Sequence, residues 1–150
     1  MKQLPSVADL QDMEAIRQVK ARYVRYGDTK NWEGFRELLT EDFEAHYDGL
    51  PRATQESPSS GGINGLDMFL QAFPAMLSNC ITIHHLYSNE IVITGSSTAT
   101  GIWAMHDVVN LPTCTFRGWG HYHEEYEKLD GQWKIKKIRV TRLQVEEEWL

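Results

Sequence analysis

The second half of the chain consists of four long segments with β-strand character, and this pattern limits the fold more than any other feature. Alternating apolar and polar positions, rich in β-branched and aromatic residues, predict strands at 81–93, 98–110, 115–128 and 132–145. Gly95-Ser96 and Asp130-Gly131 are typical of hairpin turns, and a longer connection is expected at 111–113. Strands joined in this way form an antiparallel sheet.

The first part of the chain has helical periodicity instead. Ser6 and Asp9 have the spacing of a capping box, and apolar residues then recur every three or four positions over 10–26. Gly27 is expected to end this helix, because a glycine often stands just past a helix end. A second, short helix is predicted from Asn31.

The segments between these helices and the long strands are less regular. Residues 41–47 alternate as a strand does, and residues 51–62 are rich in proline, serine and glycine, which predicts a surface loop or flap. A third helix is expected at 64–73, ended or kinked by Pro74. Helices followed by long antiparallel strands predict an α+β fold, and we expect one domain over residues 1–150.

Composition excludes several classes of function. The chain has 15 Lys and Arg against 21 Asp and Glu, a net charge of −6, and no basic run, which argues against nucleic acid or anionic membranes as partners. No apolar stretch reaches the roughly 18 residues of a membrane span. Since the first residues lack the apolar core of a signal peptide, we expect a cytoplasmic protein whose Cys80 and Cys114 are free thiols. Gly-rich phosphate loops and dinucleotide fingerprints are also absent, so no nucleotide or flavin cofactor is expected.

Several polar residues fall on predicted apolar faces, where they could carry chemistry. Strand alternation places Arg142 on the same face as Val140, and Asp107 on the same face as Trp103. Four histidines also lie in predicted strands: His84, His106, His121 and His123. An apolar cavity that held such groups would shift their pKa values and support acid–base chemistry.

Structural roles are the alternative for the same residues. Asp28, at the end of a helix, would then be a turn or capping residue, and Tyr23 a core aromatic. Arg142 would pair with Glu124 or Glu146 at the surface.

A metal site is a further alternative. His121 and His123 point the same way along one strand, and Glu125 shares their parity. Together with His84 or His85 from another strand, they could form a ligand set.

Four segments together resemble the SnoaL-like family of the nuclear transport factor 2-like superfamily: MEAIRQVKARYVRYGDTKNWEGFRELLTEDFEAHYDG, TIHHLYSNEIVI, TATGIWAMHD and YEKLDGQWKIKKIRVTR. The resemblance covers about residues 10–146. It is nearest to the bile acid 7α-dehydratases and more distant to the scytalone dehydratases and hexachlorocyclohexane dehydrochlorinases. It implies a cone-shaped, curved antiparallel sheet with N-terminal helices that enclose a deep pocket, in a cystatin-like topology.

The resemblance also implies a set of pocket residues. Catalytic roles fall on Tyr23, Asp28, His84 and Asp107, and substrate binding on Tyr47, His85, Trp103, Tyr122 and Arg142. The implied base is His84, held by Asp28, with His85 as the alternative because a slip of one residue swaps the strand faces. Asp107 would protonate the leaving hydroxyl or pair with Arg142, and close pairing would make it a poor acid.

The implied function is a dehydratase-type β-elimination on a hydrophobic cyclic or polycyclic hydroxy ketone, without a cofactor or metal. An isomerase or a polyketide cyclase on the same scaffold is one alternative, and a non-catalytic domain that binds a small molecule is another. The family also implies a homo-oligomer, a dimer or a trimer. Trp119 and Trp133 are predicted on the exposed face that would form its contact.

Overall fold

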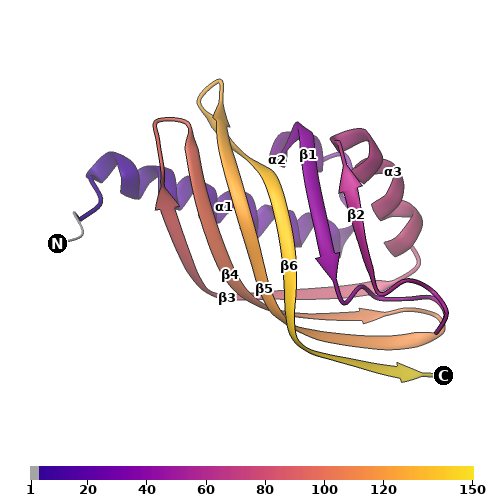
Figure 1. The fold of residues 1–150 in the computed structure, drawn as a ribbon. Helices are drawn as coiled ribbons and strands as arrows, with labels where there is room; N and C mark the ends of the chain where they lie inside the picture. Colours follow the sequence, from indigo (N-terminus) through magenta and orange to yellow (C-terminus); the bar gives the residue numbers. More distant parts are fainter. Residues whose placement is uncertain (1–3) are drawn as a thin grey trace.

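The chain folds into three helices and one six-stranded sheet, as seen in a computed structural model that describes residues 4–150. The helices are α1 (Val7–Thr29), α2 (Phe35–Leu38) and α3 (Leu66–Leu77). The strands are β1 (Leu39–Asp48), β2 (Ser60–Asn64), β3 (Ile81–Ile93), β4 (Thr98–Asn110), β5 (Cys114–Leu129) and β6 (Gln132–Trp149). This is the predicted α+β fold, and the four predicted long strands are all present (Figure 1).

The sheet is curved and unclosed, with α1 lying across one face and α3 beside β2 at one end (Figure 1). Its strand order is β2-β1-β6-β5-β4-β3, and all neighbours are antiparallel except β1 and β6, which run parallel. The expectation of a purely antiparallel sheet is therefore wrong for this one pair. Most of the chain separates β1 from β6, so no hairpin forces them to run in opposite directions.

Irregular pairing bends the long strands. The register shifts within β3, between Leu86 and Asn89, and at two places between β5 and β6. An extra residue on one strand increases the local twist and bends the sheet. The curvature leaves a concave face, on which alternate residues of β4, β5 and β6 are buried.

α1 begins and is buried as predicted, but it ends later. The hydroxyl oxygen of Ser6 accepts a hydrogen bond from the backbone N–H of Asp9, and the backbone N–H of Ser6 donates one to the Asp9 carboxylate, which completes the capping box. The helix continues through Gly27 to Thr29, and Lys30 takes the left-handed conformation at its end, with φ of 62°. The predicted end at Gly27 is therefore wrong by two residues.

Three shorter elements also differ from expectation. The second helix is only the four residues of α2, and the end of the predicted loop at 51–62 contributes the start of β2. Pro74 lies inside α3, which continues for three residues beyond it. Proline removes one helical hydrogen bond, and the apolar side of α3, including buried Phe69 and Leu77, compensates by packing on the core.

One predicted surface residue lies in the core. Trp133 is buried, and its indole Nε1 donates a hydrogen bond to Asp12 at 2.9 Å. The prediction that it faces outward is wrong, because β6 carries an extra residue near Lys136 that inverts the parity of the strand before it. Trp119 does lie on the outer face, where its ring stacks on His106 at 4.6 Å.

Cys80 and Cys114 are free thiols, as predicted, and the structure buries both. Within residues 4–150, no helix has the length and apolar character needed to cross a membrane.

Candidate active site

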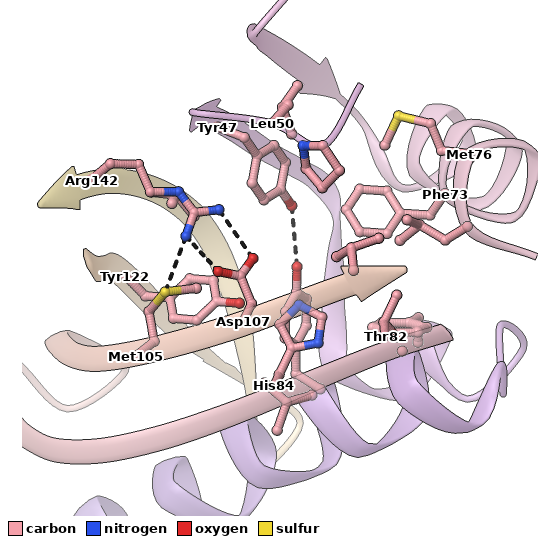
Figure 2. A pocket seen from close by; sticks show the side chains of 18 residues that line it. Tyr47, Leu50, Phe73, Met76, Thr82, His84, Met105, Asp107, Tyr122 and Arg142 are labelled. Carbon is pink, nitrogen blue, oxygen red and sulfur yellow. Dashed lines mark hydrogen bonds and ion pairs between the residues drawn. The ribbon is translucent and has the colours of Figure 1, made fainter. Parts of the chain in front are cut away.

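A pocket opens inside the concave face, where α1, α3 and the loop after β1 meet the sheet (Figure 2). Its cavity is about 60 Å³, several times the space that one buried water needs. Most of the wall is apolar, with Val24, Phe35, Leu50, Phe73, Met76 and Leu77 among its members. The polar groups in this wall are few, so each is exposed to a medium of low dielectric constant.

Asp28 and His84 form a hydrogen-bonded pair at one side of the pocket. Asp28 Oδ1 lies 2.7 Å from Nδ1 of the imidazole, and Oδ2 accepts the backbone N–H of His84 at 2.9 Å. Because a carboxylate can only accept, the ring nitrogen that it contacts is the one that carries the proton. In the neutral imidazole, Nε2 is then a lone-pair acceptor on a ring that points into the pocket (Figure 2).

Thr82 also forms a hydrogen bond with the carboxylate of Asp28. Its hydroxyl donates to Asp28 Oδ1 at 2.9 Å and accepts a hydrogen bond from Lys30 Nζ at 3.2 Å. Burial raises the pKa of Asp28, but hydrogen bonds and charge from His84, with the Thr82 bond, outweigh burial, and the net pKa lies below the ordinary value. Asp28 is therefore ionised at neutral pH.

Two tyrosine hydroxyls meet inside the pocket. Tyr23, from α1, and Tyr47, from β1, have their oxygens 3.1 Å apart, and either can be the donor (Figure 2). Tyr122, from β5, lines the same cavity. Burial raises the pKa of all three phenols above the ordinary value. They stay protonated and can act as hydrogen-bond donors, but not as phenolate bases.

Asp107 and Arg142 form a two-pronged ion pair on the sheet wall, beside His84, because Asp107 on β4 is the cross-strand neighbour of His84 on β3. The guanidinium nitrogens lie 2.6 and 3.1 Å from the two carboxylate oxygens, and Nε of Arg142 donates to the backbone oxygen of Asp48 at 3.1 Å. Gly118 lies between the strands at this point, and a Cβ there would be 2.5 Å from Asp107 Oδ1. The pairing occupies both carboxylate oxygens of Asp107 and leaves Arg142 with most of its donors occupied.

Residues 8–139 match the SnoaL-like domain family. The chain belongs to the SnoaL-like family. It is thereby a member of the nuclear transport factor 2-like superfamily, as the sequence motifs predict. The nearer resemblance to bile acid 7α-dehydratases stays a prediction.

Solved structures with the SnoaL-like fold match nearly the whole chain. A protein assigned as a scytalone dehydratase, from Novosphingobium aromaticivorans, is 20% identical with a TM-score of 0.77, covering 94% of this chain and 90% of that one. The hexachlorocyclohexane dehydrochlorinase LinA-type3 from Novosphingobium barchaimii is 17% identical with a TM-score of 0.76, covering 93% and 91%. A protein assigned as an aromatic ring hydroxylase, also from Novosphingobium aromaticivorans, is 17% identical with a TM-score of 0.80, covering 97% and 96%. At these identities the likeness shows the fold.

In this SnoaL-like domain, six of the nine residues named from the sequence line the pocket directly, and Asp28 reaches it through His84. The six are Tyr23, Tyr47, His84, Asp107, Tyr122 and Arg142. The other two do not line it. His85 is exposed on the outer face, because neighbouring strand residues point to opposite sides. Trp103 lies deeper in the core, where its indole donates to the hydroxyl of Tyr126 at 2.9 Å.

Sequence reasoning missed part of the SnoaL-like pocket. Thr82 could have been found, because it stands two residues before His84 and so shares its strand face. The covering residues from α3, such as Phe73 and Met76, carry no polar signal and depend on how that helix docks.

The alternative metal set is not assembled. Within residues 4–150, no three His, Cys, Asp or Glu side chains are placed to hold a metal ion. His121 and His123 lie on the outer face with ring centroids 6.3 Å apart, and His123 Nε2 lies 3.0 Å from the hydroxyl of Thr141.

Proposed function

We propose that this protein is a lyase that removes water by β-elimination from a hydrophobic cyclic hydroxy ketone, without a cofactor. The observation that carries the proposal is the 2.7 Å contact between Asp28 and the Nδ1 of His84 in a pocket whose wall is mostly apolar. A base that is held in one tautomer and partly shielded from bulk water suits abstraction of a proton from carbon.

In the proposed reaction, Nε2 of His84 takes the proton from the carbon next to the substrate carbonyl. The electrons of that C–H bond form the new C=C bond as the C–O bond to the hydroxyl breaks. The hydroxyl leaves with a proton returned by the imidazolium, so the products are an enone and water. Asp28 stabilises the imidazolium between these two transfers, as the carboxylate does in a hydrolase triad.

The pocket tyrosines can stabilise the negative charge that develops on the substrate carbonyl. Tyr23 and Tyr47 can donate to the carbonyl oxygen as it becomes negative, which in a dry pocket is worth a few kcal/mol. The Asp107–Arg142 pair is already satisfied internally. We assign it the role of a fixed polar wall beside the leaving group, in place of the general acid expected for Asp107.

The matched relatives are compatible with this chemistry. A dehydratase eliminates water and a dehydrochlorinase eliminates hydrogen chloride, so both names describe an elimination on this fold. The fold alone does not select a reaction, since another match is assigned as a hydroxylase.

The test is a screen of one- and two-ring β-hydroxy ketones, with a polycyclic ketone included. Ultraviolet absorbance detects the conjugated product and mass spectrometry detects the loss of water. We expect His84→Ala to lower turnover more than about 10²-fold. His85→Ala is the matched control, because the neighbouring imidazole lies on the outer face, and it should behave as wild type. Equal turnover by the wild type and His84→Ala would remove His84 from the role of base.

One observation favours a second candidate, an isomerase that moves a proton without loss of water. Since Asp107 is tied to Arg142, His84 is the one polar group of the pocket wall that the geometry offers as a proton carrier. A single carrier suffices to transfer a proton between two carbons. A product of unchanged mass, with deuterium taken up from heavy water, would identify this reaction.

A further inference from the structure

A charged pair lies buried behind the pocket. Lys20, on α1, and Glu124, on β5, have side chains with no exposed surface, and Nζ lies 2.5 Å from the carboxylate oxygen Oε1. The other carboxylate oxygen accepts the hydroxyl of Tyr126, which in turn accepts the indole N–H of Trp103. Neither Lys20 nor Glu124 lines the cavity, so the proposed reaction does not use them directly.

The ammonium of Lys20 is placed against two of the three tyrosines of the pocket wall. It lies 3.3 Å from the ring centroid of Tyr122 and 4.2 Å from that of Tyr23. Among the described residues, no atom accepts a hydrogen bond from it, and its contact with Glu124 is an ion pair without hydrogen-bond geometry. Apart from Glu124, its charge is therefore met by two aromatic faces, which is a cation–π arrangement.

Such a pair is costly as a purely structural feature. Taking an ammonium and a carboxylate out of water costs several kcal/mol each, and a well-packed apolar pair of the same volume is often as stable or more so. Three-residue spacing on α1 fixes Lys20 and Tyr23 on the same side of the helix. A cation against the face of a phenol draws electron density from the ring, which makes the hydroxyl a better hydrogen-bond donor.

We infer that Lys20, held by Glu124, is a positioning residue that fixes the rings of Tyr23 and Tyr122 and strengthens the Tyr23 hydroxyl as a donor to a negative oxygen in the pocket. The inference rests on the proposed role of Tyr23. Its two effects, on the free protein and on a bound oxyanion, can nevertheless be measured without any turnover.

The variant that tests the inference is the double replacement Lys20→Met with Glu124→Gln. Methionine keeps the length of the lysine stem, and glutamine keeps an acceptor for the hydroxyl of Tyr126. Removing both charges avoids leaving one of them buried alone, so the variant should fold. Circular dichroism and thermal unfolding check that it does.

The first measurement uses the free protein labelled with ¹³C at the tyrosine Cζ atoms, each of the six resonances being assigned by a Tyr→Phe replacement. We expect the resonances of Tyr23 and Tyr122 to shift in the double variant. Tyr87, which is exposed and outside the pair, is the internal control and should not move. Unchanged resonances of Tyr23 and Tyr122 would overturn the inference.

The second measurement uses 4-nitrophenolate as a one-ring oxyanion, whose absorbance reports binding. We expect the double variant to bind it about 2- to 30-fold more weakly than wild type, the range of one cation–π contact. In a Tyr23→Phe background the same double replacement should have no effect, because the hydroxyl is missing. An equal loss in both backgrounds, or no loss in either, would mean that the pair does not act through Tyr23.

These outcomes are independent of the proposed function. Suppose that no hydroxy ketone loses water, but the double replacement weakens nitrophenolate binding only when the Tyr23 hydroxyl is present. The proposed elimination then fails and the role of Lys20 stands. If turnover is found but the double replacement weakens nitrophenolate binding equally with and without the Tyr23 hydroxyl, or not at all, the inference fails and the proposed function stands. In an active enzyme, we expect the double variant to lower kcat and leave KM nearly unchanged.

Discussion

Asp28 holds His84 at two points, because one carboxylate oxygen contacts the ring nitrogen at 2.7 Å and the other accepts the backbone N–H at 2.9 Å. This double contact joins the end of α1 to β3 and fixes both the position and the tautomer of the imidazole. A second His–Asp pair, His46 with Asp48, lies at the surface with a contact of 3.1 Å. The two pairs differ in their surroundings, and that difference makes the surface pair a control for the pocket pair.

Asp28→Asn should lower turnover about 10²-fold or more while the fold stays intact. An amide can present its N–H to the ring, which reverses the tautomer and places the proton on Nε2, where the lone pair is needed. Steady-state kinetics on the substrate found by the screen would measure the loss. Asp48→Asn should leave turnover unchanged, and equal effects of the two replacements would mean that Asp28 has no special role.

Thr82→Val should lower turnover about 10-fold, the cost of one hydrogen bond to a charged group. Valine keeps the shape of threonine but cannot donate to Asp28, and it also removes the acceptor for Lys30 Nζ. Thr82→Ser restores the hydroxyl and should recover most of the rate. Thr100→Val, on the exposed face of β4, is the control for the same chemical change. Failure of serine to rescue would show that the methyl group, and not the hydroxyl, is what matters.

The sequence was sufficient for the long strands, because alternation over 13 or more residues leaves little freedom in β3, β4, β5 and β6. The sequence was not sufficient to predict on which side of the sheet a side chain lies, because one extra residue in a strand reverses that side. The extra residue in β6 inverted the side on which Trp133 lies. His84 and His85 could be told apart only once the register against β4 placed His84 opposite Asp107.

The sequence predicted most of the polar residues that belong to the site, but not which of them contact one another. Parity placed Asp107 and Arg142 on inner faces, yet their pairing depends on Gly118, which leaves room between them. Lys20 lies on the apolar stripe of α1 with Ile16 and Tyr23, but a lysine in a helix is ordinarily solvated. Only tertiary packing shows that this one is buried against Glu124.

Gly118→Ala should lower the free energy of unfolding by about 2–4 kcal/mol, because separating a buried ion pair leaves uncompensated charge. The new Cβ would collide with Nη1 of Arg142 and lie 2.5 Å from Oδ1 of Asp107. Urea unfolding measures the change. Gly61→Ala is the control, since its Cβ would meet only Leu50 at an ordinary 3.4 Å. Stability within about 0.5 kcal/mol of wild type, the ordinary range for a surface substitution, would show that the ion pair yields without cost.

The buried Lys20 predicts a pH dependence of stability with a definite sign. Burial lowers its pKa from 10.5 to about 8, although the charge of Glu124 opposes that shift. Between these two values the unfolded chain binds more protons at this position than the native chain does. The free energy of unfolding therefore rises with pH through this window, by roughly 1.4 kcal/mol per pH unit at most.

Comparison with the Lys20→Met and Glu124→Gln double variant isolates the contribution of this buried pair, because every titrating group outside the pair is common to both proteins. At pH 7 the variant should be as stable as wild type or more so, since it buries no charge. By pH 9.5 the wild type should have gained about 1–2 kcal/mol relative to the variant, as measured by urea unfolding at both pH values. A stability difference that is the same at pH 7 and pH 9.5 would mean that Lys20 keeps its ordinary proton affinity in the folded protein, and that Glu124 and the two tyrosine rings fully offset its burial.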